Sequence, residues 1–151
     1  MPYIAGSEPA RGCVFCLARD GSDDRASLVL RRSGLAFLIL NAYPYAPGHL
    51  MAVLNRHVGS FTEATGEELT DAMRLAQRGV AALSTEYRAE GFNIGLNQGR
   101  VAGAGIADHL HVHVVPRWTG DHNFFTVIGE GRVLPEALST TWERLKGRVD
   151  D

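Results

Sequence analysis

Apolar and polar residues alternate along this chain with two different periods, one typical of strands and the other of a helix. Five segments show the strand pattern: residues 27–31, 35–40, 49–54, 92–97 and 109–115. The first two are joined by a predicted turn at Gly34. Residues 41–48 cannot continue a strand, because Pro44 and Pro47 lack the N–H donors that a ladder requires. Pro116 is expected to end the fifth strand for the same reason.

The helical period is strongest in the middle of the chain. Apolar residues recur there at steps of three and four: Leu69, Ala72, Met73, Ala76, Val80, Leu83 and Tyr87. Thr65 and Glu68 have the spacing of a capping box, in which each side chain accepts a hydrogen bond from the other residue's amide. We therefore predict a long amphipathic helix that begins after Thr65. Residues 135–149 predict a short C-terminal helix, and the polar residues 17–26 are interpreted as a loop.

Composition places these elements in one α+β domain. The chain has 151 residues, a mass of 16.4 kDa and 45% apolar residues, enough for one core. Its net charge of -2 and its pI near 6.3 give no electrostatic case for a nucleic-acid partner. No apolar run approaches the ~20 residues that a membrane span needs, and the N-terminus shows no signal peptide. We expect a cytoplasmic protein with no nucleic-acid or membrane partner.

Three histidines, His109, His111 and His113, alternate with apolar residues in the fifth predicted strand. Because successive side chains of a strand point to opposite faces, the three imidazoles are predicted to share one face, ~7 Å apart along the strand. The alternative is a solvent-facing strand that happens to carry histidine. Half of the chain's six histidines lie within these five positions, which favours a functional surface.

Such a row of imidazoles is suited to metal binding and to nucleophilic attack, because the neutral ring carries a free lone pair. Attack on phosphorus gives a phosphoramidate, whose P–N bond is readily cleaved in a second displacement. The glycine-rich residues 99–105 precede the strand, and such loops let backbone N–H groups approach phosphate oxygens. Flexible connectors are also glycine-rich, so only the loop and the histidines together indicate a phosphate site.

These motifs carry a resemblance to a known family. The order His, apolar, His, apolar, His and two further apolar residues resembles the pattern of the histidine triad (HIT) family. Residues 41–49, 108–118 and 120–124 are similar to its diadenosine tetraphosphate phosphorylase-like branch in bacteria, and the similarity covers nearly the whole chain. The resemblance implies a single HIT domain over residues 1–151. Its expected architecture is an antiparallel sheet of about five strands with one long helix and a short C-terminal helix.

The resemblance also implies catalytic roles for three histidines. His111 would be the nucleophile that attacks the α-phosphorus and forms a covalent nucleotidyl-histidine. His113 would contact the same phosphate and stabilise the negative charge that develops there. His49 would lie near the phosphate end of the nucleotide and support the triad, although a histidine after Pro47 and Gly48 is also a simple way to open a strand.

Binding roles follow from the same resemblance. Asn41 would hydrogen-bond the ribose hydroxyls, and Asn97 would contact the transferred phosphate or the leaving group, unless it merely caps a turn. Further predicted phosphate-site residues lie just before the triad: Gly103, Ala104, Gly105 and Asp108. Asp108 would orient a histidine or tune its pKa; the alternative is a solvated aspartate at the strand end.

One departure from the family pattern concerns the second step of the reaction. The phosphorylase-like branch usually has a small hydroxyl residue after the loop glycine, where it helps to hold the accepting phosphate. This chain has Gly, Ala, Gly and Ile at residues 103–106, with no serine or threonine. The choice between phosphorolysis and hydrolysis therefore stays open.

Cys13 and Cys16 are separated by two residues. In a reducing compartment this spacing indicates metal ligation or thiol chemistry rather than a structural disulfide. Many metal-bearing histidine triad proteins combine such a pair with two histidines, and this chain has His57 and His109 at the matching positions. The resemblance implies a structural Zn²⁺ with four ligands that holds an N-terminal segment, residues 1–26, to the sheet. The alternative is two buried free cysteines.

The resulting prediction is an enzyme that cleaves a phosphoanhydride bond of dinucleoside polyphosphates, above all diadenosine tetraphosphate. Inorganic phosphate or water would be the second acceptor. Two alternatives remain: a hydrolase of adenosine phosphoramidates or adenylates, and a sensor that binds adenine nucleotides with weak activity. By analogy with the family we also expect a homodimer that pairs through the long helix and a sheet edge, and no redox cofactor.

Overall fold

The computed structural model describes residues 12–121 and 136–150. Residues 1–11 of the predicted zinc-binding segment, the motif residues 122–124 and the predicted helix start at residue 135 lie outside these ranges. None of the helices within them combines the length and the apolar character that a bilayer span would require.

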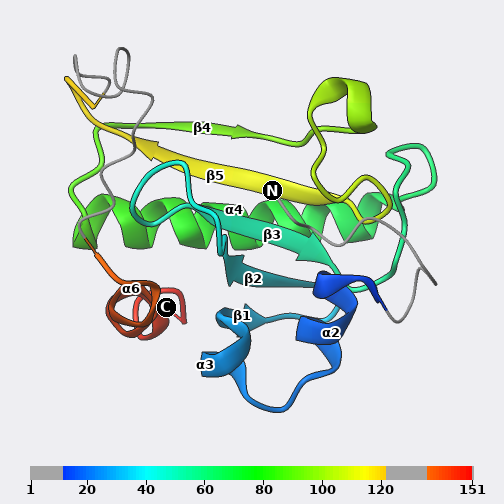
Figure 1. Cartoon of the computed structure of the whole chain (residues 1–151), viewed down its shortest axis with the longest axis horizontal. Coiled ribbons are helices and arrows are strands. Elements are labelled where there is room, and N and C mark those ends of the chain that lie inside the picture. Colours follow the sequence, from blue (N-terminus) through cyan, green and yellow to red (C-terminus); the bar gives the residue numbers. More distant parts are fainter. Residues whose placement is uncertain (1–11, 122–135, 151) are drawn as a thin grey trace.

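Five strands form one antiparallel sheet in the order β1-β2-β3-β5-β4 (Figure 1). Their bounds are Val29–Arg32 (β1), Ala36–Leu40 (β2), Leu50–Leu54 (β3), Gly91–Gly95 (β4) and His111–Arg117 (β5). The five predicted strands are confirmed, each with ends displaced by no more than two residues. Because β3 and β5 are antiparallel neighbours, the segment that follows β3 and the segment that precedes β5 lie at the same end of the sheet.

The prediction that Pro116 ends the last strand is wrong, because β5 continues to Arg117 and Pro116 pairs with Phe92. The carbonyl of Arg117 accepts a hydrogen bond from the amide of Glu90, so the backbone groups of Arg117 point toward β4. Those of Pro116 point the other way, toward β3. On that side β3 reaches only as far as the position opposite Val114. The missing N–H of Pro116 therefore costs no ladder hydrogen bond.

A long helix, α4 (Gly66–Glu86), packs against β2, β3 and β5 (Figure 1). The predicted capping box is confirmed: the Thr65 hydroxyl accepts from the amide of Glu68, and the Glu68 carboxylate accepts from the amide of Thr65. Most of the predicted apolar stripe is buried or half-buried, although Met73 is 47% exposed. The helix covers one face of the sheet and leaves the other face to different elements.

Part of that other face is covered by a short helix where the sequence predicted a loop at residues 17–26. α2 (Val14–Asp20) buries Phe15 against the sheet. α3 (Asp24–Ser27) is a single turn, capped by the side chain of Asp23. An isolated seven-residue helix is unstable in water. The helix α2 is therefore stabilised by its packing on the sheet and not by its own sequence pattern. The loop prediction is wrong for this reason, whereas the Asp23 cap was a local signal for α3.

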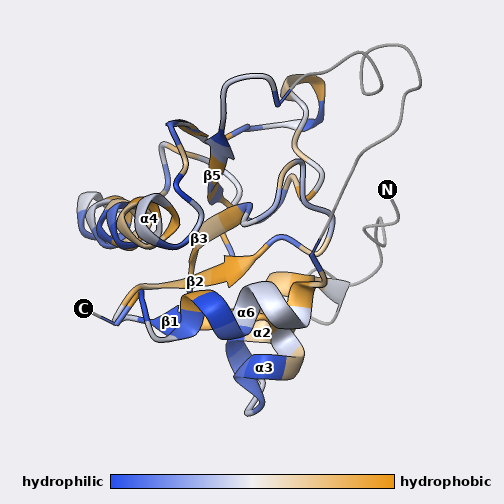
Figure 2. Ribbon diagram, turned by 90° about the vertical axis from the view of Figure 1, so that its left-hand side faces the viewer, coloured by the Kyte–Doolittle hydropathy of each residue, from blue (hydrophilic) through white to orange (hydrophobic). Residues whose placement is uncertain are grey.

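The C-terminal helix α6 (Leu138–Lys146) is confirmed and lies beside the edge strand β1 (Figure 2). The Trp142 indole donates to the carbonyl of Val29, and the Lys146 ammonium donates to the carbonyl of Leu30. These bonds occupy backbone groups that an edge strand would otherwise offer to another chain. In the same view β2 and β3 are hydrophobic along their length, as expected of buried strands.

Candidate active site and metal centre

The triad histidines lie on the sheet face opposite α4, as the alternation predicted. The apolar residues between them belong to the core that packs under α4. The rings of His111 and His113 are in edge contact, with centroids 4.8 Å apart. His49, directly before β3, extends the row, because its ring lies 5.1 Å from that of His113. The fold therefore brings the three predicted catalytic residues together.

His111 has a free lone pair on one ring nitrogen, Nε2. Its Nδ1 lies 2.8 Å from the carbonyl oxygen of His109. A carbonyl can only accept a hydrogen bond, so Nδ1 carries the proton and Nε2 is unprotonated in the neutral ring. Burial of the ring, which is 5% exposed, lowers the pKa of His111 below 6.5. At neutral pH His111 is therefore an uncharged imidazole with a nucleophilic Nε2.

His49 and His113 belong to a hydrogen-bonded relay that assigns the tautomers of both rings. The amide of Tyr45 donates to Nδ1 of His49 over 3.1 Å, so His49 carries its proton on Nε2. That Nε2 lies 2.9 Å from Nδ1 of His113 and donates to it. His113 in turn holds its proton on Nε2, where it can donate to a phosphate oxygen. Burial, followed by the neighbouring His111, lowers the pKa of His113 to about 4, so this ring is neutral at pH 7.

Asn41 is buried at the end of β2, directly before the loop that leads to His49. Its Oδ1 accepts the amide of Tyr43 over 2.8 Å, and its Nδ2 lies 3.4 Å from Nδ1 of His49. The structure thus places Asn41 beside the relay, where it shapes residues 42–48. Its contact with a ribose stays a prediction.

The glycine-rich loop contains one turn of 3₁₀ helix, η1 (Arg100–Ala102). The amides of Gly103 and Ala104 donate to carbonyls earlier in the same loop. Within residues 12–121 and 136–150, the amide of Gly105 has no backbone acceptor. Of the three predicted loop positions, Gly105 is therefore the one best able to donate to a phosphate, whereas Gly103 forms the turn with a φ of +93°.

The two remaining predicted binding residues differ in their surroundings. Asn97 is half-buried, and its Nδ2 would lie 3.7 Å from a β-carbon placed on Gly103. Asp108 is exposed, and no hydrogen bond joins it to a histidine in the described parts of the chain. Asn97 therefore borders the loop beside the triad, while the structure provides no contact through which Asp108 would orient an imidazole. The roles of both toward a nucleotide stay predictions.

Cys13, Cys16, His57 and His109 converge so that their ligand atoms all lie within 4.8 Å of one another. Nδ1 of His109 is 3.3 Å from Sγ of Cys13 and 3.2 Å from Nδ1 of His57. Sγ of Cys16 is 3.4 Å from Nδ1 of His57 and 3.7 Å from Nδ1 of His109. Metal bonds of ~2.3 Å to sulfur and ~2.0 Å to nitrogen in a tetrahedron separate the ligands by roughly 3.3–3.8 Å. The four residues therefore fit one four-coordinate metal ion.

The surroundings of His109 leave its Nδ1 unprotonated, as a metal ligand must be. Its Nε2 lies 2.6 Å from the carbonyl oxygen of Leu54 and donates to it, which leaves the lone pair on Nδ1. Burial lowers the pKa of His109 to about 4. Burial, followed by the neighbouring Cys13, raises the pKa of the Cys16 thiol to about 11. The imidazole is thus ready to coordinate at neutral pH, whereas the thiol needs a cation to stabilise its thiolate.

Two residues that the sequence analysis did not identify connect this cluster to the rest of the site. A β-carbon on Gly59 would stand 2.8 Å from the carbonyl oxygen of Ala107, so glycine lets the two histidine-bearing segments of the cluster meet. Phe15 contacts the rings of His109 and His111, with centroids 5.4 Å and 4.9 Å away. One side chain therefore joins the metal cluster to the predicted nucleophile. The feature of the sequence that could have identified Phe15 is its position between the two cysteines.

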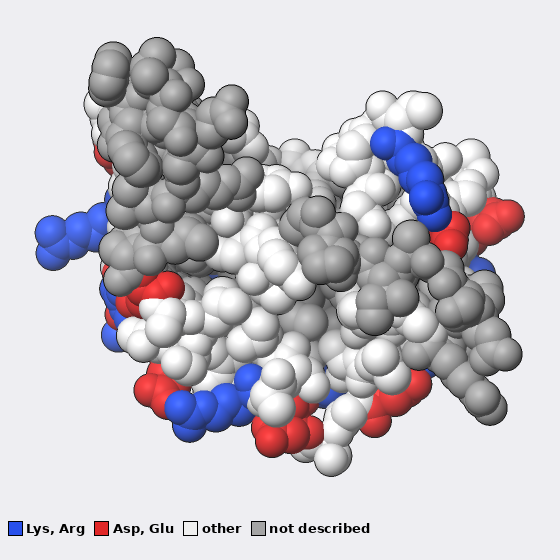
Figure 3. Space-filling model, in the orientation of Figure 1, with Lys and Arg blue, Asp and Glu red and all other residues white. Residues whose placement is uncertain are grey.

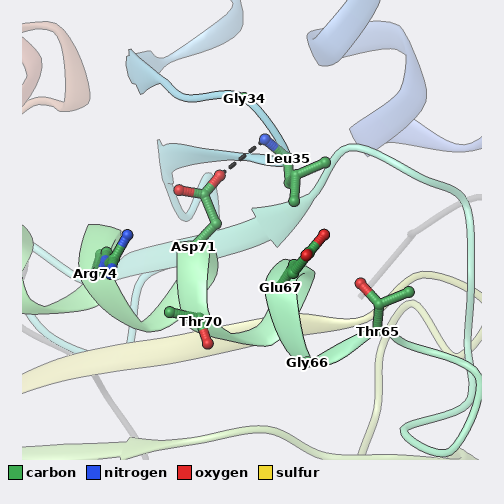
Figure 4. A pocket seen from close by; sticks show the side chains of 8 residues that line it. All are labelled: Gly34, Leu35, Thr65, Gly66, Glu67, Thr70, Asp71 and Arg74. Atoms are coloured by element: carbon green, nitrogen blue, oxygen red, sulfur yellow. Dashed lines mark hydrogen bonds between the residues drawn. The ribbon is translucent and has the colours of Figure 1, made fainter.

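The histidine face has no concentrated charge in its described part. In Figure 3 the coloured Lys, Arg, Asp and Glu atoms lie toward the margins of this view, and the described atoms nearer its centre are white. A separate hollow lies between the β1–β2 turn and α4, where the Asp71 carboxylate accepts the amide of Leu35 over 2.8 Å (Figure 4). The charged side chains that line this hollow are of both signs, Glu67, Asp71 and Arg74, and its lining includes no histidine that could act as a nucleophile. The histidine face therefore remains the candidate phosphate site.

A family model described as the HIT domain matches residues 23–120, which include all five histidines described above. The chain belongs to the histidine triad family. Cys13 and Cys16 precede the matched residues, so the family match does not itself cover the thiol half of the metal cluster.

This histidine triad chain is 46% identical over 118 residues to the AP-4-A phosphorylase of Mycobacterium tuberculosis, covering 78% of this chain and 60% of that relative. It therefore spans about 60% of the length of this relative. It is 30% identical over 93 residues to the bis(5'-adenosyl)-triphosphatase of Dictyostelium discoideum, covering 62% of each. The crystal structure of a Zn-bound histidine triad family protein from Mycobacterium smegmatis matches with a TM-score of 0.76 and 25% identity, covering 93% of this chain and 95% of the other. The predicted HIT-like fold is confirmed.

Proposed function

We propose that this histidine triad protein cleaves a phosphoanhydride bond of dinucleoside polyphosphates through a covalent nucleotidyl-histidine at His111. The observation that carries the proposal is the hydrogen bond from Nδ1 of His111 to the carbonyl of His109, because it leaves the lone pair on Nε2. The names of two similar proteins, an AP-4-A phosphorylase and a bis(5'-adenosyl)-triphosphatase, support this substrate class.

In the first step, Nε2 of His111 attacks the α-phosphorus, the N–P bond forms, and the bond from phosphorus to the bridging oxygen breaks. The departing nucleoside polyphosphate keeps the electron pair of the broken bond. His113 donates its Nε2–H to a non-bridging oxygen, where negative charge develops, and the relay from His49 holds that donor in place. The carbonyl of His109 stabilises the positive charge of the substituted imidazole through Nδ1–H.

In the second step, inorganic phosphate or water attacks the same phosphorus and the N–P bond breaks, which returns the lone pair to His111. With diadenosine tetraphosphate, phosphate as acceptor gives ADP and ATP, whereas water gives AMP and ATP and releases a proton. The absence of a hydroxyl residue at residues 103–106 favours water, and the name of the mycobacterial relative favours phosphate.

Incubation of the full chain with diadenosine tetraphosphate, with and without inorganic phosphate, tests the proposal through chromatography of the products. We expect the dinucleotide to disappear and ATP to form, together with ADP if phosphate is the acceptor or AMP if water is. Adenosine 5'-phosphoramidate serves as the comparison substrate. Turnover of the phosphoramidate alone would contradict the proposed substrate class. Binding of AMP without turnover of either compound would indicate a nucleotide-binding protein instead of an enzyme.

We also propose that the metal in the cluster of Cys13, Cys16, His57 and His109 is a structural Zn²⁺. Two thiolates and two imidazoles whose ligand atoms lie within 4.8 Å of one another are a donor set that zinc prefers, and four protein ligands leave no position for a substrate. A matching structure from Mycobacterium smegmatis is described as Zn-bound. Such an ion would cross-link α2 to the segments that follow β3 and precede β5.

A homodimer through the β4 edge is a further proposal. β4 pairs only with β5 within the described sheet, and its Ile94 is 48% exposed. Met73 on α4 is exposed to a similar extent, so each of the two elements that the family analogy names offers one exposed apolar side chain. Light scattering should give about twice the chain mass of 16.4 kDa. A mass equal to one chain at micromolar concentration would contradict this proposal.

A further inference from the structure

Tyr45 packs on the hydrogen-bonded pair of His49 and His113. Its ring centroid lies 4.5 Å from that of His49. It lies 6.1 Å from that of His113, and the planes of these two rings differ by only 22°. Tyr45 is 47% exposed, and the ring contacts described for it are with these two imidazoles.

The loop before β3 holds Tyr45 against these rings. The amide of Tyr45 donates to Nδ1 of His49, and the amide of His49 donates to the carbonyl of Ala46 over 3.1 Å. Tyr45 therefore contacts His49 through both its backbone and its ring. The backbone contact decides which nitrogen of His49 carries the proton, and the ring contact restricts how the imidazole can turn.

The orientation of both imidazoles matters because the bond between them is directional. Rotation of either ring about its Cβ–Cγ bond moves Nε2 of His49 away from Nδ1 of His113, and hydrogen bonds weaken steeply away from linear geometry. Without this bond, the proton of His113 could occupy either nitrogen. The ring would then present a donor to the phosphate only part of the time.

We propose that Tyr45 is a positioning residue for the reaction: its aromatic ring holds His49 and His113 so that Nε2–H of His113 faces the substrate phosphate. This inference rests on the proposed function of the triad. It requires the flat ring of Tyr45 and not its hydroxyl group, because the contacts with both imidazoles are made by the ring.

Kinetics of three variants test the role of the ring. Tyr45→Ala should lower kcat for diadenosine tetraphosphate roughly 10- to 100-fold, with KM changed by less than about threefold, because it misplaces a donor without removing it. Tyr45→Phe should recover kcat to within about twofold of the wild type. Tyr43→Ala is the matched control: Tyr43 is in the same loop and 43% exposed, and among residues 12–121 and 136–150 the ring contacts of His49 are with Tyr45 and His113. Its kcat should stay within about twofold.

The tautomer of His113 provides a readout that does not depend on turnover. Long-range ¹H–¹⁵N NMR of the unliganded protein should show the proton of His113 on Nε2 in the wild type and in Tyr45→Phe. In Tyr45→Ala it should show a mixture of the two tautomers. This measurement separates a failure of the positioning role from a failure of the proposed function.

Three results would overturn the inference: unchanged kcat in Tyr45→Ala, an equal loss in Tyr45→Phe, or a rise in KM with unchanged kcat. The second would assign the effect to the hydroxyl group, and the third would make Tyr45 a substrate-binding residue. Thermal unfolding checks each variant. If Tyr45→Ala does not fold, Tyr45→Leu replaces it, with the same expected loss because leucine offers no flat ring.

Discussion

His111→Ala is expected to lower turnover of diadenosine tetraphosphate by about 10⁴-fold or more, because the covalent step needs the lone pair on Nε2. Affinity for AMP should remain largely intact, since the nucleotide contacts that we propose are made by other residues of the site. A single-turnover reaction with labelled substrate, quenched in alkali to preserve the P–N bond, measures the intermediate directly. The wild type should carry label on the protein, and His111→Ala should carry none.

His113→Ala is the control for this experiment. It keeps the nucleophile and removes one donor to the phosphate, so label should still accumulate while kcat falls about 10²- to 10³-fold. Thermal unfolding of both variants tests whether the buried site retains its structure. Turnover by His111→Ala within tenfold of the wild type, or label on it at the wild-type level, would show that His111 is not the nucleophile.

Cys13→Ser should abolish stoichiometric metal binding and destabilise the fold. Wild-type protein purified without added zinc should contain about one equivalent by metal analysis. A ligand that binds only the folded state stabilises it by RT ln(1 + [L]/Kd), about 4 kcal/mol when free zinc exceeds Kd ~1,000-fold. For a chain of this size that corresponds to a Tm lower by roughly 8–16 °C in the variant.

Val14→Ala is the matched control, because Val14 follows Cys13 on α2 and is 37% exposed. It should keep the metal and nearly all of the stability. A strong chelator should lower the Tm of the wild type toward that of Cys13→Ser, and it should have no further effect on Cys13→Ser itself. Wild-type protein with far less than one equivalent of zinc, and with a Tm that chelation does not change, would refute the zinc site.

Loss of the proposed metal is expected to disturb the position of the nucleophile, His111, because Phe15 contacts its ring. α2 has seven residues and depends on tertiary contacts for its stability. In the proposed zinc site the ion would hold both ends of the Cys-x-x-Cys segment, and Phe15 between them packs against His111 with ring centroids 4.9 Å apart. Movement of α2 would therefore admit water to the nucleophile and loosen its orientation.

Features that depend only on the order of neighbouring residues in the sequence were predictable. The alternation of histidine with apolar residues placed the triad on one sheet face, because side chains of a strand alternate whatever surrounds them. Thr65 and Glu68 predicted the start of α4, since both hydrogen bonds of the capping box lie within one helical turn. The local sequence led to a wrong prediction where tertiary contacts decide the outcome. Pro116 stays in β5 because β3 has already ended on the side of its missing N–H.

The metal cluster was predicted from resemblance to a family, because spacing alone linked Cys13 to Cys16 and to nothing else. The ring of Tyr45 and the ring of Phe15 were missed for a related reason. An aromatic residue in a loop or a short helix has no periodic pattern that identifies its contacts, and both side chains act on histidines far along the chain.

The amino-acid sequence by itself determined which residue types stand in a row, on which strand and on which face. Only the tertiary structure decided which nitrogen of His109 and of His113 carries the proton. A histidine tautomer is set by the groups beside its two nitrogens, and for these two rings they come from distant segments: the carbonyl of Leu54 for His109 and the ring of His49 for His113. Which ring nitrogens of these two histidines can donate a proton and which can accept one or bind a metal is therefore a property of the folded chain.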